Sequence, residues 1–130
     1  MSYRWVDHTA ELELEIEATD EREVLEEAVR ALAELLGVKG PGELHRPVAV
    51  TAADRPALLA AWIEELAFLA ESEGFVATGI VELTLGDDHL HAAVAGMLDA
   101  PPPLVKAVTY HRLAFEASGE GYVARVVLDV

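Results

Sequence analysis

The first pattern in the chain is a strict alternation of acidic and aliphatic residues. Residues 11–17 read E-L-E-L-E-I-E. Successive side chains of a β-strand point to opposite faces, so a period of two predicts a strand with Leu12, Leu14 and Ile16 inward and four carboxylates outward. We therefore expect one face of the sheet that contains this strand to meet water.

Two later segments carry apolar residues at helical spacing. Asp20 and Glu23 resemble a capping box, and the helix that they begin is expected to continue to Gly37. Its predicted buried side comprises Val24, Leu25, Ala28, Val29, Leu32, Leu35 and Leu36. Asp54 is expected to cap a second helix that ends at Gly74. The buried side of that helix is predicted to be Leu58, Leu59, Trp62, Ile63, Leu66 and Leu69.

Further strands are predicted where apolar runs are separated by turn signals. They are residues 47–52, 76–85, 89–95, 113–117 and 122–130. The Gly86-Asp87-Asp88 turn joins two of them in a hairpin, and a long loop is expected at residues 97–103. Because strands and helices do not alternate regularly, we predict an α+β fold. It is a single domain over residues 1–130, with a mixed, mostly antiparallel sheet and two main helices packed on one face.

Composition narrows the class of protein. The chain has 130 residues, of which 52% are apolar, enough for one packed core. Acidic residues number 24 against 9 basic ones, which disfavours stable direct binding to a nucleic-acid backbone. There is no cysteine, so thiolate metal sites and thiol nucleophiles are excluded. The N-terminus lacks the apolar core of a signal peptide and residues 58–69 are too short to span a bilayer, so we expect a soluble cytoplasmic protein without a membrane partner.

Polar residues concentrate at three places that amphipathic patterning does not explain. These are D-H-T-A-E at residues 7–11, V-K-A-V-T-Y-H at residues 105–111, and L-D-V at residues 128–130. The chain has no Walker A loop, no dinucleotide-binding glycine motif, no G-x-S-x-G elbow and no K-x-D-G motif. Independent nucleotide chemistry is therefore not expected.

These three motifs, in this order, resemble the archease family. The resemblance spans nearly the whole chain and extends to an E-L-A-F-L-A-E-S-E-G-F-V stretch at residues 65–76. Archeases usually have H-T-A-D where this chain has Glu11, and the loop before Lys106 is shorter here than is common in the family. The resemblance implies the α+β fold and an accessory protein that is not itself an enzyme.

The resemblance also implies a metal site formed by Glu11, Asp129 and the carboxylate of Val130, with Asp7 in the outer shell. The chemistry of these groups agrees with that implication. If the last strand lies beside the first long one, the anions come close together, and each pair repels by roughly 4 kcal/mol at an effective dielectric constant near 20. A divalent cation would relieve the repulsion, and ligation by oxygen alone favours calcium, magnesium or manganese over zinc.

The partner that the resemblance implies is an RtcB-type, GTP-dependent RNA ligase. That ligase joins RNA ends carrying a 2′,3′-cyclic or 3′-phosphate to a 5′-hydroxyl, as in tRNA splicing. Archease-like proteins promote guanylylation of the ligase and its repeated turnover. The residues expected to take part in activation are Lys106, Asp7, His8 and His111.

Two other functions remain open on the sequence. One is a metal-dependent phosphoester hydrolase that uses the same carboxylates, with His8 or His111 as general base. The other is a chaperone-like binding module whose acidic face shields nucleic-acid-binding proteins. Substitution of Asp129 or Lys106 by alanine would leave the second function unchanged.

Each candidate residue also has a purely structural interpretation. D-H-T at residues 7–9 is often a turn whose side chains satisfy backbone amides. An isolated lysine such as Lys106 is usually solvated, and a histidine such as His111 is often a strand cap. His89 and His91 lie on one strand face and are expected to be exposed. Trp5, Trp62 and Phe75 are assigned to the core.

Overall fold

The computed structural model describes residues 1–8 and 10–130, and of His8 only the backbone. Seven strands and two helices occur in the described part of the chain. In order they are β1 (Ser2–His8), β2 (Glu11–Ala18), α1 (Glu21–Leu35), β3 (Leu44–Thr51), α2 (Arg55–Glu73), β4 (Phe75–Leu85), β5 (His89–Leu98), β6 (Ala107–Ser118) and β7 (Gly121–Asp129). No helix among these residues is long and apolar enough to cross a membrane.

Both helices begin and end where the sequence predicts. The Asp20 carboxylate accepts a hydrogen bond from the backbone N–H of Glu23 at 2.8 Å, and Asp54 caps Ala57 in the same way at 2.9 Å. Such caps satisfy backbone donors that have no partner within the helix. Gly74 ends α2 with a φ of 67°, a left-handed conformation that glycine adopts without steric cost.

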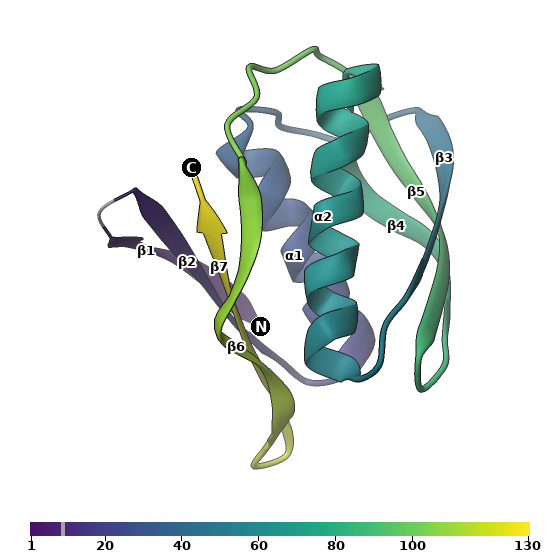
Figure 1. The fold of residues 1–130 in the computed structure, drawn as a ribbon. Coiled ribbons are helices and arrows are strands. Elements are labelled where there is room, and N and C mark those ends of the chain that lie inside the picture. Colours follow the sequence, from purple (N-terminus) through teal and green to yellow (C-terminus); the bar gives the residue numbers. More distant parts are fainter. Residues whose placement is uncertain (9) are drawn as a thin grey trace.

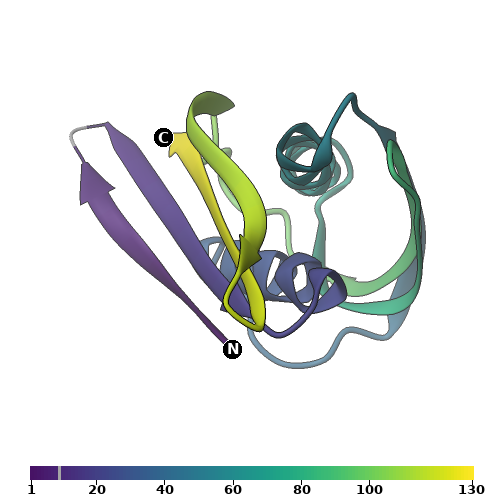
Figure 2. The same ribbon diagram turned by 90° about the horizontal axis from the view of Figure 1, so that it is seen from below.

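The strands form two antiparallel sheets, so the expected single mixed sheet with both helices on one face is wrong in that detail. The orders are β1-β2-β7-β6 in the first sheet and β3-β5-β4 in the second. Figure 2 shows the two helices lying between the sheets. The α+β class and the two helices are confirmed.

A helix that contacts two sheets must be apolar around most of its circumference. In α2, Leu58, Leu59, Ala60, Trp62 and Ile63 are all buried, which is far more than one stripe. The Trp62 indole N–H donates to the carbonyl of Leu25 in α1 at 3.2 Å, so the two helices are joined inside the core. Trp62 and Phe75 are core residues as predicted, and Trp5 packs against the core while only partly buried.

Other strands are longer than predicted. β1 was not foreseen, although Tyr3 and Trp5 alternate with Arg4 in its sequence. β6 begins at Ala107 and not at Leu113, so most of the V-K-A-V-T-Y-H motif is strand. β5 continues to Leu98, which moves the start of the long loop to Asp99.

Candidate functional site

Glu11 and Asp129 are brought together by the register of the first sheet. Glu11 is the first residue of β2 and Asp129 the last of β7, and the two are directly paired across these antiparallel strands. Paired residues share one face of a sheet, with Cβ atoms roughly 4.5–5.5 Å apart. Both residues are half-buried. The two predicted carboxylates therefore lie side by side on the face that points away from the helices.

The backbone around Asp129 is held from both sides. The Lys106 N–H donates to the Asp129 carbonyl at 2.8 Å, and the Val130 N–H donates to the Ala10 carbonyl at 3.2 Å. β6 also pairs with β7 here, with Ala107 opposite Asp129. In Figure 1 the C-terminal end of β7 lies between the start of β6 and the start of β2. Glu11, Lys106 and Asp129, one residue from each polar motif, thus lie at one edge of the molecule.

The other predicted residues are less closely grouped. Asp7 is exposed and pairs with Leu12, so it occupies a position on the opposite face of the sheet from Glu11. His111 is exposed and lies four residues beyond Ala107, roughly 13 Å along the strand at the usual rise per residue. His8 pairs with Glu11 through its backbone, but its side chain and Thr9 lie outside the described residues, and with them the predicted D-H-T turn.

The two histidines of the second sheet take no part in this grouping. His91 is exposed, as expected, whereas His89 is half-buried. Their rings meet edge to face at 5.8 Å, and His89 Nδ1 lies 3.1 Å from the Asp88 carboxylate. His89 therefore contacts both His91 and the turn residue Asp88.

Basic neighbours distinguish Glu13 and Glu15 of β2 from Glu11 and Asp129. Arg4 lies 2.6 Å from Glu15, and its hydrogen bond to that carboxylate lowers the pKa of Glu15. Glu13, only 2% exposed, has the Arg112 guanidinium 3.4 Å away. In the described part of the chain, neither Glu11 nor Asp129 forms an ion pair. Two adjacent carboxylates without a basic partner are what a bound cation would compensate.

The two paired carboxylates, Glu11 and Asp129, are hard oxygen donors. Within residues 1–8 and 10–130, no three described His, Cys, Asp or Glu side chains are grouped closely enough to hold a metal. Glu11 and Asp129 therefore offer two carboxylates, and the half-buried Val130 follows Asp129 directly. Carboxylate oxygens are donors that suit calcium, magnesium or manganese.

Sequence reasoning missed the irregular middle of β6. Its register against β7 shifts between Thr109 and Ala114, and Arg112 has a φ of 60°. The Arg125 Nε–H donates to the Arg112 carbonyl at 2.7 Å, which holds the bulge over the face that carries Glu13. The signal available in the sequence was Arg112 itself, a basic residue in a chain with few of them.

Comparison with known proteins identifies the family. The model of the Archease protein family (MTH1598/TM1083) matches residues 3–130. The chain belongs to the archease family. It is similar to a protein archease of Archaeoglobus fulgidus, with 33% identity covering all of both chains. It is also similar to a protein archease of Methanosarcina acetivorans, with 30% identity over 98% of this chain and 95% of that one.

Two solved structures share the fold. The solution structure of Methanobacterium thermoautotrophicum protein 1598 superposes with a TM-score of 0.74 at 26% identity and covers 99% of each chain. A crystal structure from Thermotoga maritima, described as an archease and possible chaperone, superposes with a TM-score of 0.69 at 23% identity. It covers 96% of this chain and 94% of its own. The archease fold predicted from the motifs is thereby confirmed.

Proposed function

We propose that this archease activates an RtcB-type, GTP-dependent RNA ligase in the cytoplasm and is not itself an enzyme. It promotes guanylylation of the ligase and multiple turnover in tRNA splicing or RNA repair. The observation that carries the proposal is the pairing of Glu11 with Asp129, two neighbouring carboxylates without a basic partner among the described residues. Membership of the archease family supports it.

In this proposal Glu11, Asp129 and the carboxylate of Val130 hold one divalent ion. When bound, such an ion supplies positive charge that can stabilise phosphate oxygens. The paired strands β2 and β7 hold the Glu11 and Asp129 side chains at a fixed spacing. The hydrogen bond from the Lys106 N–H to the Asp129 carbonyl fixes the backbone at Asp129. Because that bond uses only its main chain, the exposed ammonium of Lys106 is available to contact a GTP phosphate or a ligase carboxylate.

The charge of the whole chain supports a protein partner with a basic surface. The formal net charge is −15, so long-range attraction accelerates encounter with the RNA-binding face of a ligase and disfavours RNA itself. The archease would then leave before the RNA substrate binds.

The decisive experiment is multiple-turnover RNA ligation by a cognate ligase with GTP and metal, with and without this protein. We expect strong stimulation by the wild type and its loss in folded Asp129→Ala and Lys106→Ala variants. Glu17→Ala, an exposed carboxylate at the far end of β2, is the matched control and should stimulate normally. Equal stimulation by all variants would contradict the assignment of the site.

A chaperone-like role is the second candidate, because one protein with this fold is described as a possible chaperone. Under that function the protein suppresses aggregation of a basic client, and Asp129→Ala and Lys106→Ala suppress it equally well. The hydrolase alternative is tested in the same preparation, because it requires metal-dependent cleavage of a phosphoester by the isolated protein.

A further inference from the structure

One large apolar side chain of α2 is not covered by either sheet. Phe68 is 58% exposed, whereas Leu66 is 2% exposed and Leu69 is 7% exposed. Solvation of a phenyl ring is unfavourable, and an exposed aromatic residue beside a groove is a frequent feature of protein interfaces. Phe68 is therefore a candidate contact for another molecule.

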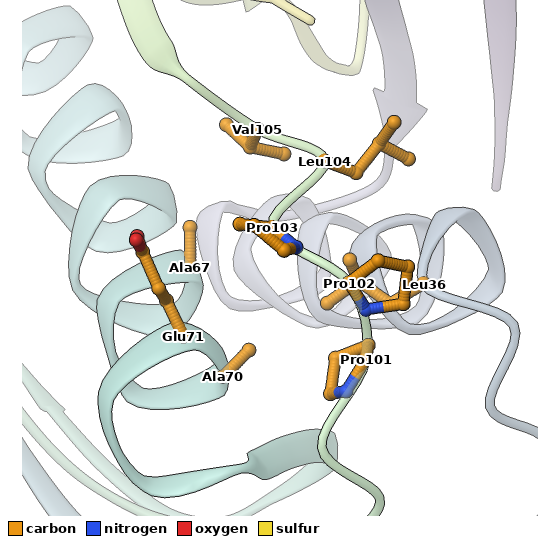
Figure 3. A pocket seen from close by; sticks show the side chains of 9 residues that line it. All are labelled: Leu36, Ala67, Ala70, Glu71, Pro101, Pro102, Pro103, Leu104 and Val105. Atoms are coloured by element: carbon orange, nitrogen blue, oxygen red, sulfur yellow. The ribbon is translucent and has the colours of Figure 1, made fainter.

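Phe68 borders a groove between α2 and the beginning of β6. The groove encloses about 120 Å³, and Ala67, Val105 and Val108 contribute its apolar lining. Figure 3 shows the adjoining segment, in which Pro101, Pro102 and Pro103 pass beside Ala67 and Ala70 of α2. Proline fixes φ, so the segment that leads into the start of β6 has little backbone freedom.

Acidic residues stand on both sides of Phe68. Glu64 and Glu71 lie about one turn before and after it on the same face of α2, and both line the groove. Among the described residues, neither Glu64 nor Glu71 forms an ion pair. The groove therefore presents an aromatic ring between two uncompensated carboxylates.

Two residues that line the groove also contact the backbone of Asp129, whose carboxylate lies on the outer face of the first sheet. Lys106 donates its backbone N–H to the Asp129 carbonyl, and Ala107 is paired with Asp129. A partner that contacts Lys106 is thus brought directly beside Phe68.

We propose that this groove binds a basic, amphipathic segment of the same ligase, an inference that rests on the function proposed above. One large apolar side chain of that segment packs on Phe68, and flanking arginine or lysine residues pair with Glu64 and Glu71. The complementarity of charge selects this occupant, because a second copy of a chain with a net charge of −15 would bring like charges together. The groove supplies affinity, while Glu11, Asp129 and Lys106 supply activation.

The test separates affinity from maximal rate. Ligation is measured as a function of archease concentration, and binding to the ligase is measured by calorimetry. Phe68→Ala is expected to raise the dissociation constant roughly tenfold, the usual loss at an aromatic contact, and to reach the wild-type rate at saturation. Asp129→Ala is expected to bind with wild-type affinity and to lose the rate. Val81→Ala, an exposed apolar residue of the second sheet, is the control and should change neither.

A second variant keeps the inference testable if Phe68→Ala is poorly folded. Glu64→Gln combined with Glu71→Gln should weaken binding at low salt and flatten its dependence on ionic strength. If the wild type activates but these variants titrate as it does, the groove is not the docking site and the proposed function stands. Absence of both binding and activation by the wild type overturns the two proposals together. Self-association of the wild type that Phe68→Ala abolishes would make a second copy the occupant and overturn this inference.

Discussion

The start and the middle of the outer face of β2 carry the same residue type in different surroundings. Glu13 and Glu15 have arginines beside them, Arg112 and Arg4 respectively. Glu11 has the carboxylate of Asp129 as its cross-strand neighbour. A carboxylate with a basic neighbour is neutralised within the fold, whereas two adjacent carboxylates repel until a cation binds. Identical positions in an alternating sequence can therefore serve structure at one place and binding at another.

The sharpest test of this comparison is removal of one carboxylate from the unneutralised pair. Asp129→Asn is expected to lower metal affinity at least about a hundredfold, measured by calorimetry with calcium or manganese, because it deletes one of the two anionic side chains. Without metal the variant should be as stable as the wild type or more so, since a repulsion has been removed. Glu15→Gln is the matched control, and unchanged metal binding by Asp129→Asn would exclude Asp129 as a ligand.

Loss of a charge beside Glu13 is expected to lower stability, whereas loss of the Asp129 charge is not. Arg112→Ala removes the guanidinium beside the buried Glu13 and should destabilise the protein by about 2 kcal/mol, because a buried carboxylate loses one favourable charge interaction. Urea denaturation measures this effect. Arg22→Ala, which breaks an exposed pair with Glu26 on α1, should cost under about 0.5 kcal/mol. Equal losses for the two variants would show that burial of Glu13 does not matter.

An extension of the chain probes the third anion. Two residues added after Val130 move the terminal carboxylate away from Asp129, and we expect metal affinity to fall about tenfold, or 1.4 kcal/mol. The free energy of unfolding in the absence of metal should not change. Wild-type metal affinity in the extended protein would remove Val130 from the ligand set.

The smallest expected effect is the pH dependence of the Glu15 pair. The hydrogen bond from Arg4 lowers the pKa of Glu15 from its ordinary value of 4.5. A lowered pKa in the folded state contributes stability above pH 4.5, and that stability is lost as the pH falls through the folded value. Arg4→Ala should therefore raise the pKa of Glu15 in an NMR titration and destabilise the protein slightly at pH 7, but not below both pKa values. An unchanged pKa would contradict the role of Arg4.

Much of the fold follows from local patterns. The capping residues Asp20 and Asp54 and the left-handed Gly74 act within a few residues of themselves, so both helices were correctly bounded. The alternation at residues 11–17 likewise predicted β2. β1 was missed because only Tyr3 and Trp5 marked its inner face. The bulge at Arg112 was missed because its contacts, with Glu13 and Arg125, are to residues distant in the sequence.

The sequence by itself determined both helices, most of the strands, the acidic character and the three motifs that resemble archease. Only the tertiary structure decided that the strands divide into two sheets and that Glu11 is paired with Asp129, 118 residues away. The reason is that helix caps and strand alternation are set by neighbouring residues, whereas strand register depends on how distant aliphatic faces pack on the helices. That register also decided that Glu11 lies beside Asp129, while Glu13 and Glu15 lie beside arginines.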